Sequence, residues 1–284
     1  MSEERVIRMH PEWGGVVPTE VFLEEGGKIV EAASKAGIPL RLIGGVAIRI
    51  HSGDFVEFAK RLSRLGPGEQ EYTDLDFASY AKFRNAVRKF FESNGYRRRR
   101  TTLSSAATQR QIYFHPDGRF YADVFFDKLL AANHPIDFRG RLELDSPTIS
   151  LGDLLLEKLQ IVSFSEKDLK DTLLLLRAHG VGEVKAPETV DAQYIASLLA
   201  KDWGFWYTAT TNLKGLRKAA LEMLALNEAE RSDVALKIDK LLEVIESQPK
   251  TAGWKMRSII GAKKRWYKPV ETAQTVGEFG IWRP

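Results

Sequence analysis

The stretch LIGGVA at residues 42–47 marks the point where a short apolar strand, expected from Leu40 to Ile43, turns into a helix. Two glycines at such a turn leave backbone N–H groups unpaired at a helix N-terminus, where the helix dipole also favours an anion. Because glycine has no Cβ, a phosphate can come close to the main chain at Gly44 and Gly45. The turn therefore predicts a phosphate-binding position, although a plain strand–helix turn would use the same residues.

The stretch YTDLDF at residues 72–77 places two carboxylates on one face of a second expected strand. Side chains alternate along a strand, so Asp74 and Asp76 share a face and Leu75 and Phe77 take the other. Adjacent carboxylates repel, and a hard cation such as Mg²⁺ that also binds a nucleotide's phosphates would remove the repulsion. An exposed strand face is the simpler explanation of the pair alone; its combination with the glycine turn favours a metal site.

A third carboxylate is expected from a hairpin further along the chain. Two β-rich runs, at residues 111–115 and 119–126, are joined by a Pro-Asp-Gly turn. Asp123 lies in the middle of the second run, where an acid would be costly to bury without a partner. We therefore expect Asp123 to face the aspartate pair across the sheet, with Asp127 as the alternative.

Gly44-Gly45 followed by Asp74-Leu75-Asp76 resembles the signature of the nucleotidyltransferase superfamily, which has the DNA polymerase β-like fold. Within it, the chain is most similar to the AbiEii-like group, known from phage-abortive-infection toxins. The resemblance covers residues 19–178. It implies that Mg²⁺ or Mn²⁺ is held by Asp74, Asp76 and Asp123, that the triphosphate lies at the two glycines, and that an NMP group passes from an NTP to a hydroxyl.

The chain departs from this family in two places. Gly45 and Asp74 are 29 residues apart, more than the family usually has, and we interpret residues 54–70 as an insertion with a helix at 55–65. An arginine often precedes the acidic pair in AbiEii-like proteins, whereas Gln70 and Glu71 stand there in this chain.

The resemblance also extends to Lys158, within an otherwise mostly apolar helix, and to Lys167, Asp168 and Asp171 after it. It implies that Lys158 reaches the phosphates of the nucleotide. A lysine that extends its ammonium group to solvent is an equally good interpretation. Asp168 is explained without any functional role as the third residue of its helix, where a carboxylate is stabilised.

Composition limits the classes of protein to which the chain can belong. The 284 residues include no cysteine, which excludes disulfides and thiolate chemistry. No apolar run approaches the roughly 20 residues of a membrane span and no signal-peptide pattern opens the sequence, so we expect a cytoplasmic protein without membrane contact. The five histidines show no ligand-type spacing, so a zinc site is not expected.

Basic residues gather in two segments. The first is Arg97, Arg98, Arg99 and Arg100, and the second, at residues 250–268, has seven Lys or Arg and no acid, including Lys263, Lys264 and Arg265. Aromatic residues are interleaved with the bases of the second segment, a pattern typical of surfaces that hold single-stranded nucleic acid. These residues are candidates for binding an acceptor, and solvated faces are the alternative.

The predicted fold class is α+β, with a nucleotidyltransferase-type mixed sheet and flanking helices at residues 1–148 and an all-helical part at residues 149–284. Beyond the elements above, helices are expected at residues 19–35 with Thr19 as N-cap, 46–50, 80–93, 150–163, 165–178, 191–201, 213–226 and 229–246, and a strand at 96–102.

The partners implied by the resemblance are an NTP, an acceptor that is RNA (such as a tRNA 3′ end), a protein or a small molecule, and an antitoxin protein. The alternative function is a nucleotidyltransferase-fold protein that binds nucleotide or nucleic acid without turnover.

Overall fold

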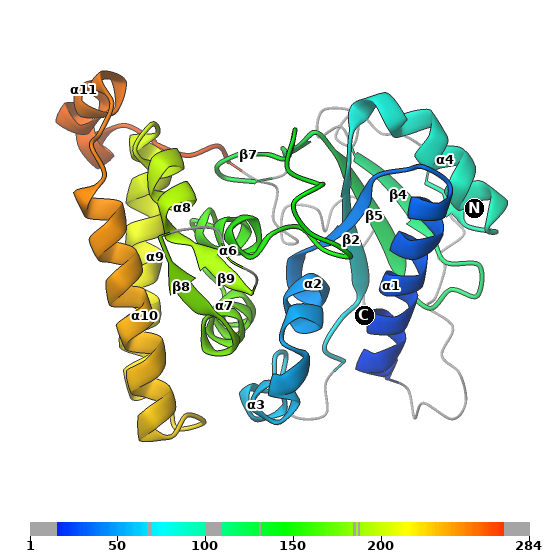
Figure 1. Cartoon of the computed structure of the whole chain (residues 1–284), viewed down its shortest axis with the longest axis horizontal. Coiled ribbons are helices and arrows are strands. Elements are labelled where there is room, and N and C mark those ends of the chain that lie inside the picture. The colour runs from blue at the N-terminus through cyan, green and yellow to red at the C-terminus, as the bar shows by residue number, and fades with distance from the viewer. Residues whose placement is uncertain are drawn as a thin grey trace.

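The computed structural model describes residues 16–66, 70–99, 110–130, 132–183, 186 and 188–269, and its centre is a mixed five-stranded sheet (Figure 1). The strand order is β1-β2-β5-β4-β3. Strands β2 and β5 run parallel, and every other neighbouring pair is antiparallel. The strands are β1 (Leu40–Ile43), β2 (Asp74–Ser79), β3 (Arg97–Arg98), β4 (Arg110–Phe114) and β5 (Tyr121–Phe126). The mixed sheet of the predicted fold class is thus present.

Ten α-helices lie in the described part of the chain, and α2 lies between the sheet and the C-terminal helices (Figure 1). The helices are α1 (Thr19–Lys35), α2 (Gly44–His51), α3 (Val56–Leu62), α4 (Arg84–Ser93), α6 (Leu151–Leu159), α7 (Glu166–Ala178), α8 (Ala192–Leu199), α9 (Trp203–Glu222), α10 (Glu228–Ser247) and α11 (Ala252–Ile260). Short 3₁₀ helices are η2 (Gly53–Phe55), η3 (Ala81–Phe83) and η4 (Gly261–Lys263).

Several predicted helices differ from the observed ones at their ends. Helix α1 has the predicted bounds, but its N-cap is Pro18; the Thr19 hydroxyl instead donates to the Glu71 carboxylate. Helix α2 already begins at Gly44. In the predicted insertion, α3 ends at Leu62 because Ser63 adopts a left-handed conformation, φ 48°. The predicted helix at 80–93 is divided into η3 and α4.

The C-terminal part is not all helical, so that prediction is wrong. Strands β8 (Gly180–Gly182) and β9 (Thr189–Asp191) form a small parallel pair. They are too short to show a two-residue period in the sequence. Helix α9 begins at Trp203, well before the predicted residue 213, because Asp202 caps it. Two other short strands, β6 (Lys128–Leu129) and β7 (Ile136–Asp137), pair beside the main sheet.

The buried apolar residues form one cluster that extends from α1 and the sheet through α2 to the C-terminal helices. The chain also crosses back to β1 at the predicted domain boundary: Leu42 N–H donates to Pro147, and Ile149 N–H donates to Leu42, at 3.0 and 3.1 Å. The boundary at residues 148 and 149 therefore stays a prediction. Among the described residues, no helix is long and apolar enough to cross a membrane.

We predict opposite effects for the same substitution at neighbouring glycines of α1. A Cβ at Gly26 would lie 3.0 Å from Leu42 Cδ1, whereas nothing lies within 4 Å of a Cβ at Gly27. Gly27→Ala should therefore stabilise the protein by about 0.5–1 kcal/mol, the usual gain in a helix interior. Gly26→Ala should lose that gain and destabilise by about 1 kcal/mol through overpacking. Denaturant unfolding measures both, and equal effects would contradict close packing of α1 on the sheet.

Candidate functional site

The three predicted aspartates lie on adjacent strands beside the glycine turn. Asp76 on β2 is the register partner of Asp123 on the parallel strand β5, so their side chains leave the same face of the sheet. Asp74 precedes Asp76 by two residues and shares that face. Gly44 follows β1 on the other side of β2; a Cβ there would lie 3.2 Å from Asp76 Oδ2. The structure thus brings together Gly44, Asp74, Asp76 and Asp123.

A fourth carboxylate, Glu157 of α6, completes this group and was not predicted from the sequence. Gly44 N–H donates to Glu157 Oε2 at 2.9 Å, so the first peptide of α2 is held by an acid from a distant helix. Glu157 is only 5% exposed. Its signal in the sequence is weak: Glu157 and Lys158 are the two charges near the end of a mostly apolar helix. We call Asp74, Asp76, Asp123 and Glu157 the carboxylate group.

The carboxylate group holds more negative charge than its protein neighbours neutralise. Burial raises the pKa of Asp76 well above its usual value, and Asp74, Asp123 and Glu157 raise it further. Burial raises the pKa of Asp123 to about 7 although Arg110 opposes this. Burial likewise raises the pKa of Glu157 to about 8, against the Gly44 hydrogen bond. Each acid would therefore be stabilised by an added cation.

The group has the chemistry of a site for Mg²⁺ or Mn²⁺, ions that prefer carboxylate oxygens. Two of its buried oxygens, Asp123 Oδ1 and Glu157 Oε1, have no hydrogen-bond partner in the described structure. The oxygens do not meet at one point, however. In the described part of the chain, the three-residue group whose ligand atoms all lie within 4.8 Å of one another is His51, His179 and Glu188 instead. Asp74, Asp76 and Asp123 share one face of the sheet, but their oxygens do not form a set of three that all lie within 4.8 Å of one another.

Asp127, the alternative third carboxylate, serves another purpose. It follows the C-terminal end of β5 with φ 58°, and its Oδ1 accepts the Ala81 N–H at 3.0 Å. This contact caps η3. Asp123, and not Asp127, therefore faces the aspartate pair.

Lys158 lies in a buried ion-pair network. Its Nζ lies 3.1 Å from Asp168 Oδ1 and 2.8 Å from Asp171 Oδ2, so it does not extend to solvent. Burial would lower the pKa of Lys158, but the two aspartates outweigh it and raise that pKa. Burial would raise the pKa of Asp171, yet Lys158 and Arg64 outweigh it and lower that pKa. Asp168 also accepts the Ser165 hydroxyl and occupies the third position of α7, as its structural interpretation predicted.

Arg64, from the predicted insertion, connects this network to the glycine turn. Its Nε and Nη2 donate to Asp171 Oδ1 and Oδ2 at 2.7 and 3.0 Å. A Cβ at Gly45 would lie 2.7 Å from Nη2, so only glycine leaves room for this guanidinium. No local pattern predicts a role for Arg64, because its acidic partner Asp171 lies 107 residues further along the chain.

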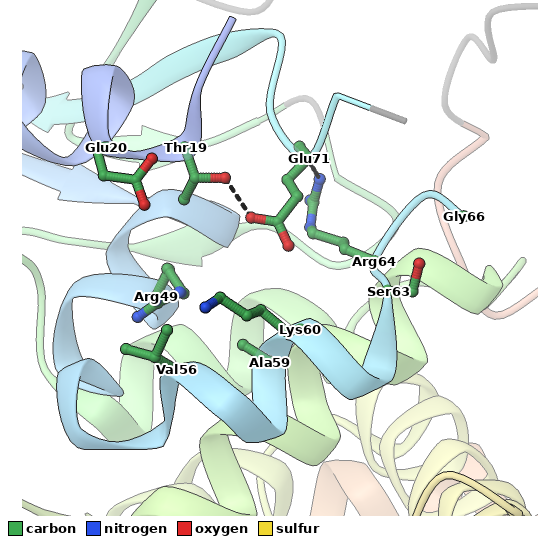
Figure 2. A pocket seen from close by; sticks show the side chains of 10 residues that line it. All are labelled: Thr19, Glu20, Arg49, Val56, Ala59, Lys60, Ser63, Arg64, Gly66 and Glu71. Atoms are coloured by element: carbon green, nitrogen blue, oxygen red, sulfur yellow. Dashed lines mark hydrogen bonds between the residues drawn. The ribbon is translucent and has the colours of Figure 1, made fainter. Parts of the chain in front are cut away.

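A cavity of about 300 Å³ borders Arg64 between α1, α2 and α3 (Figure 2). Arg49 is 7% exposed and has no hydrogen bond or ion pair with a described residue. Figure 2 shows Arg49 and Lys60 pointing toward one another in the cavity. Lys60 is also paired with the exposed Glu57. The cavity also holds the carboxylates of Glu20 and Glu71, but Glu71 accepts the Thr19 hydroxyl and Lys60 is paired with Glu57, so Arg49 is the cation best placed to bind an anion there. It is lined by Thr19, Glu20, Arg49, Val56, Ala59, Lys60, Ser63, Arg64, Gly66 and Glu71.

The two basic segments do not form one surface. Arg97 and Arg98 make up β3 at the edge of the sheet, Arg99 follows them, and Arg100 lies outside the described residues. Lys263, Lys264 and Arg265 are exposed and follow α11. Helix α11 and the strand β4 that pairs with β3 lie toward opposite ends of the molecule (Figure 1). A single acceptor surface that joins them is therefore excluded within this arrangement.

Comparison with protein-family models, with curated proteins and with solved structures finds no match to this chain.

We predict that Glu157→Gln changes how stability depends on pH. The raised pKa of Glu157 means that its contribution to stability is complete below its usual pKa of 4.5 and is lost as pH rises through about 8. In chelator, the variant should unfold like the wild type at pH 5. At pH 9 it should be more stable, by about 1.4 kcal/mol for each unit by which the pKa is raised. The amide oxygen can still accept the Gly44 N–H.

Denaturant unfolding at pH 5, 7 and 9 checks this. The control is Glu243→Gln on the exposed face of α10, whose difference in unfolding free energy from the wild type should be the same at every pH. A constant difference between Glu157→Gln and the wild type at all three values would contradict a buried, protonated Glu157.

Proposed function

We propose that the chain is a nucleotidyltransferase dependent on Mg²⁺ or Mn²⁺, similar to the AbiEii-like group, that transfers an NMP from an NTP to a hydroxyl acceptor and releases pyrophosphate. One observation carries the proposal: Asp76 lies beside Asp123 on the neighbouring parallel strand, and a Cβ at Gly44 would lie only 3.2 Å from the Asp76 carboxylate. A phosphate at this place would lie between a cation site and the first turn of α2, whose Gly44 N–H is held by Glu157.

Each residue of the site has a role in this proposal. Asp74 and Asp76 hold the cation, and Asp123 holds a second one or accepts the proton of the acceptor hydroxyl. Glu157 fixes the peptide of Gly44 and thereby the start of α2. When bound, the metal supplies charge neutralisation at the transferring phosphate.

The phosphates need cations from the chain as well. Lys158, assigned to them by the resemblance, is already paired with Asp168 and Asp171. Arg49 has no such partner and lies on α2 one turn after Gly45, on the same side of the helix. We therefore assign the terminal phosphates of the nucleotide to Arg49 in the cavity, with Lys158 holding Asp171 and, through it, Arg64 in place.

The acceptor, and any toxin role with an antitoxin partner, rest on the resemblance alone. RNA, a protein and a small molecule are the acceptor classes that it implies. Cytoplasmic location is part of the same proposal.

A second candidate function is nucleotide or nucleic-acid binding without turnover. Arg110 Nη1 lies 3.1 Å from Asp123 Oδ2, so the third carboxylate already has a cationic partner. If this pair persists with nucleotide bound, Asp123 holds neither a metal nor a proton, and the site binds without transferring.

The first test is transfer of label from each of the four NTPs, in Mg²⁺ or Mn²⁺, to crude RNA or protein. Asp76→Asn should abolish transfer because it removes a charge that holds the cation while it keeps the shape of the side chain. Asp127→Asn is the matched control, and it should transfer normally since its oxygen still caps η3.

Without metal, the melting temperature of Asp76→Asn should equal or exceed that of the wild type, because the substitution relieves carboxylate repulsion. Wild-type transfer by Asp76→Asn would overturn the proposed site. Binding of NTP with no transfer by the wild type would support the second candidate.

The basic residues after α11 give a separate test if the acceptor is RNA. Replacing Lys263, Lys264 and Arg265 with Ala should flatten the dependence of RNA binding on salt, since each neutralised phosphate contributes roughly 0.7–0.9 to the slope. The KM for RNA should rise while that for NTP stays constant. Arg49→Gln should raise the KM for NTP and leave the KM for RNA unchanged. An unchanged salt slope in the triple variant would show that the segment is a solvated face and would favour a protein or small-molecule acceptor.

A further inference from the structure

Two histidines and a glutamate from three separate elements converge away from the carboxylate group. His51 is the last residue of α2, His179 caps the end of α7, and Glu188 immediately precedes β9. Nδ1 of His51 and Nδ1 of His179 lie 3.3 and 3.2 Å from Glu188 Oε2. No regular spacing in the sequence predicts this group, because the fold brings together residues that are far apart in the chain.

His51 Nε2 lies beside two oxygens of neighbouring side chains. The Thr148 oxygen is 2.5 Å from His51 Nε2 and 3.0 Å from the Ile149 carbonyl, and its one hydrogen can be donated to either. Asp145 Oδ2, 3.5 Å from Nε2, is a second acceptor. When the Thr148 hydroxyl donates to Ile149, Nε2 of His51 carries the hydrogen and the Nδ1 of the neutral ring has a lone pair. This is the arrangement in which an outer carboxylate or hydroxyl orients a metal-binding imidazole.

In that tautomer the Nδ1 lone pair faces the Glu188 carboxylate oxygen at 3.3 Å, and a metal ion between the two atoms would bind both. Nε2 of His179 is buried without a hydrogen-bond partner, so the polar contacts of this ring are with Glu188.

The separations match those of ligands around one ion. Two ligand atoms at about 2.1 Å from a tetrahedral Zn²⁺ lie about 3.4 Å apart, close to the 3.2 and 3.3 Å between Glu188 and the two rings. Two imidazoles and one carboxylate favour Zn²⁺ over Mg²⁺, which prefers oxygen ligands alone. The Glu188 side chain is 62% exposed, so an ion can reach the group from solvent.

We propose that His51, His179 and Glu188 bind a transition-metal ion of the Zn²⁺ type, with Thr148 and Asp145 orienting His51. The ion joins the end of α2 to the end of α7 and to β9, and so fixes the helix whose first residues form the glycine turn. This site is separate from the carboxylate group and does not depend on the proposed function.

The test uses the full chain freed of metal by a chelator, titrated with ZnCl₂ by calorimetry, with Asp76→Asn as the background so that the carboxylate group contributes little. One Zn²⁺ should bind per chain, the melting temperature should rise with Zn²⁺, and excess MgCl₂ should not compete. Co²⁺ in place of Zn²⁺ should give the absorption bands of a tetrahedral ion.

Glu188→Gln should weaken Zn²⁺ binding at least about tenfold, and His51→Gln should do the same. Glu183→Gln, an exposed acid in the same loop, is the control that should bind as the background does. Absence of stoichiometric Zn²⁺ binding would overturn the proposal, as would unchanged affinity in Glu188→Gln. Because Glu188 is exposed, its substitution should not prevent folding, and a circular-dichroism spectrum confirms this.

Discussion

Repulsion among four carboxylates around one glycine is the constraint on which the site depends. The chain contains two groups of buried acids, one paired with cationic side chains and one that largely lacks them. Asp168 and Asp171 have Lys158 and Arg64 as partners, and the pKa of each aspartate is lowered. In the carboxylate group, the pKa values of Asp76, Asp123 and Glu157 are raised. The carboxylate group lacks the cationic side chains that its neighbour has, and in the proposed function a bound cation supplies that charge.

Helix α2 connects the features that matter for function. It begins at Gly44, where φ is 71° and a Cβ would approach Asp76, so glycine is required there for both backbone and space. It presents Arg49 to the cavity after one further turn and ends at His51. Because α2 packs between the sheet and the C-terminal helices (Figure 1), a shift of this helix would move the glycine turn relative to the aspartates.

Local patterns predicted much of this arrangement, and long-range contacts account for what they missed. Alternation of side chains placed Asp74, Asp76 and Asp123 on one face, and serine caps located the starts of α6 and α7. Glu157 and Arg64 could not be assigned because Gly44 and Asp171, their partners, lie more than a hundred residues away. Arg110 pairs with Asp123 within the predicted hairpin but precedes the predicted strand at 111–115. The contact between His51 and His179 is also a long-range one that no local pattern predicts. Strands β8 and β9 were not predicted because three residues are too few to show the two-residue alternation of a strand.

The most direct measurement is anomalous diffraction from crystals of the full chain grown with MnCl₂ and a non-hydrolysable NTP analogue. The account predicts a manganese peak bound by Asp74 and Asp76, with the analogue's phosphates between the ion and the glycine turn. Displacement of Arg110 from Asp123 would accompany a second ion. A structure with the analogue bound elsewhere, or with no manganese at the aspartates, would contradict the claim that the carboxylate group holds a metal for nucleotide chemistry.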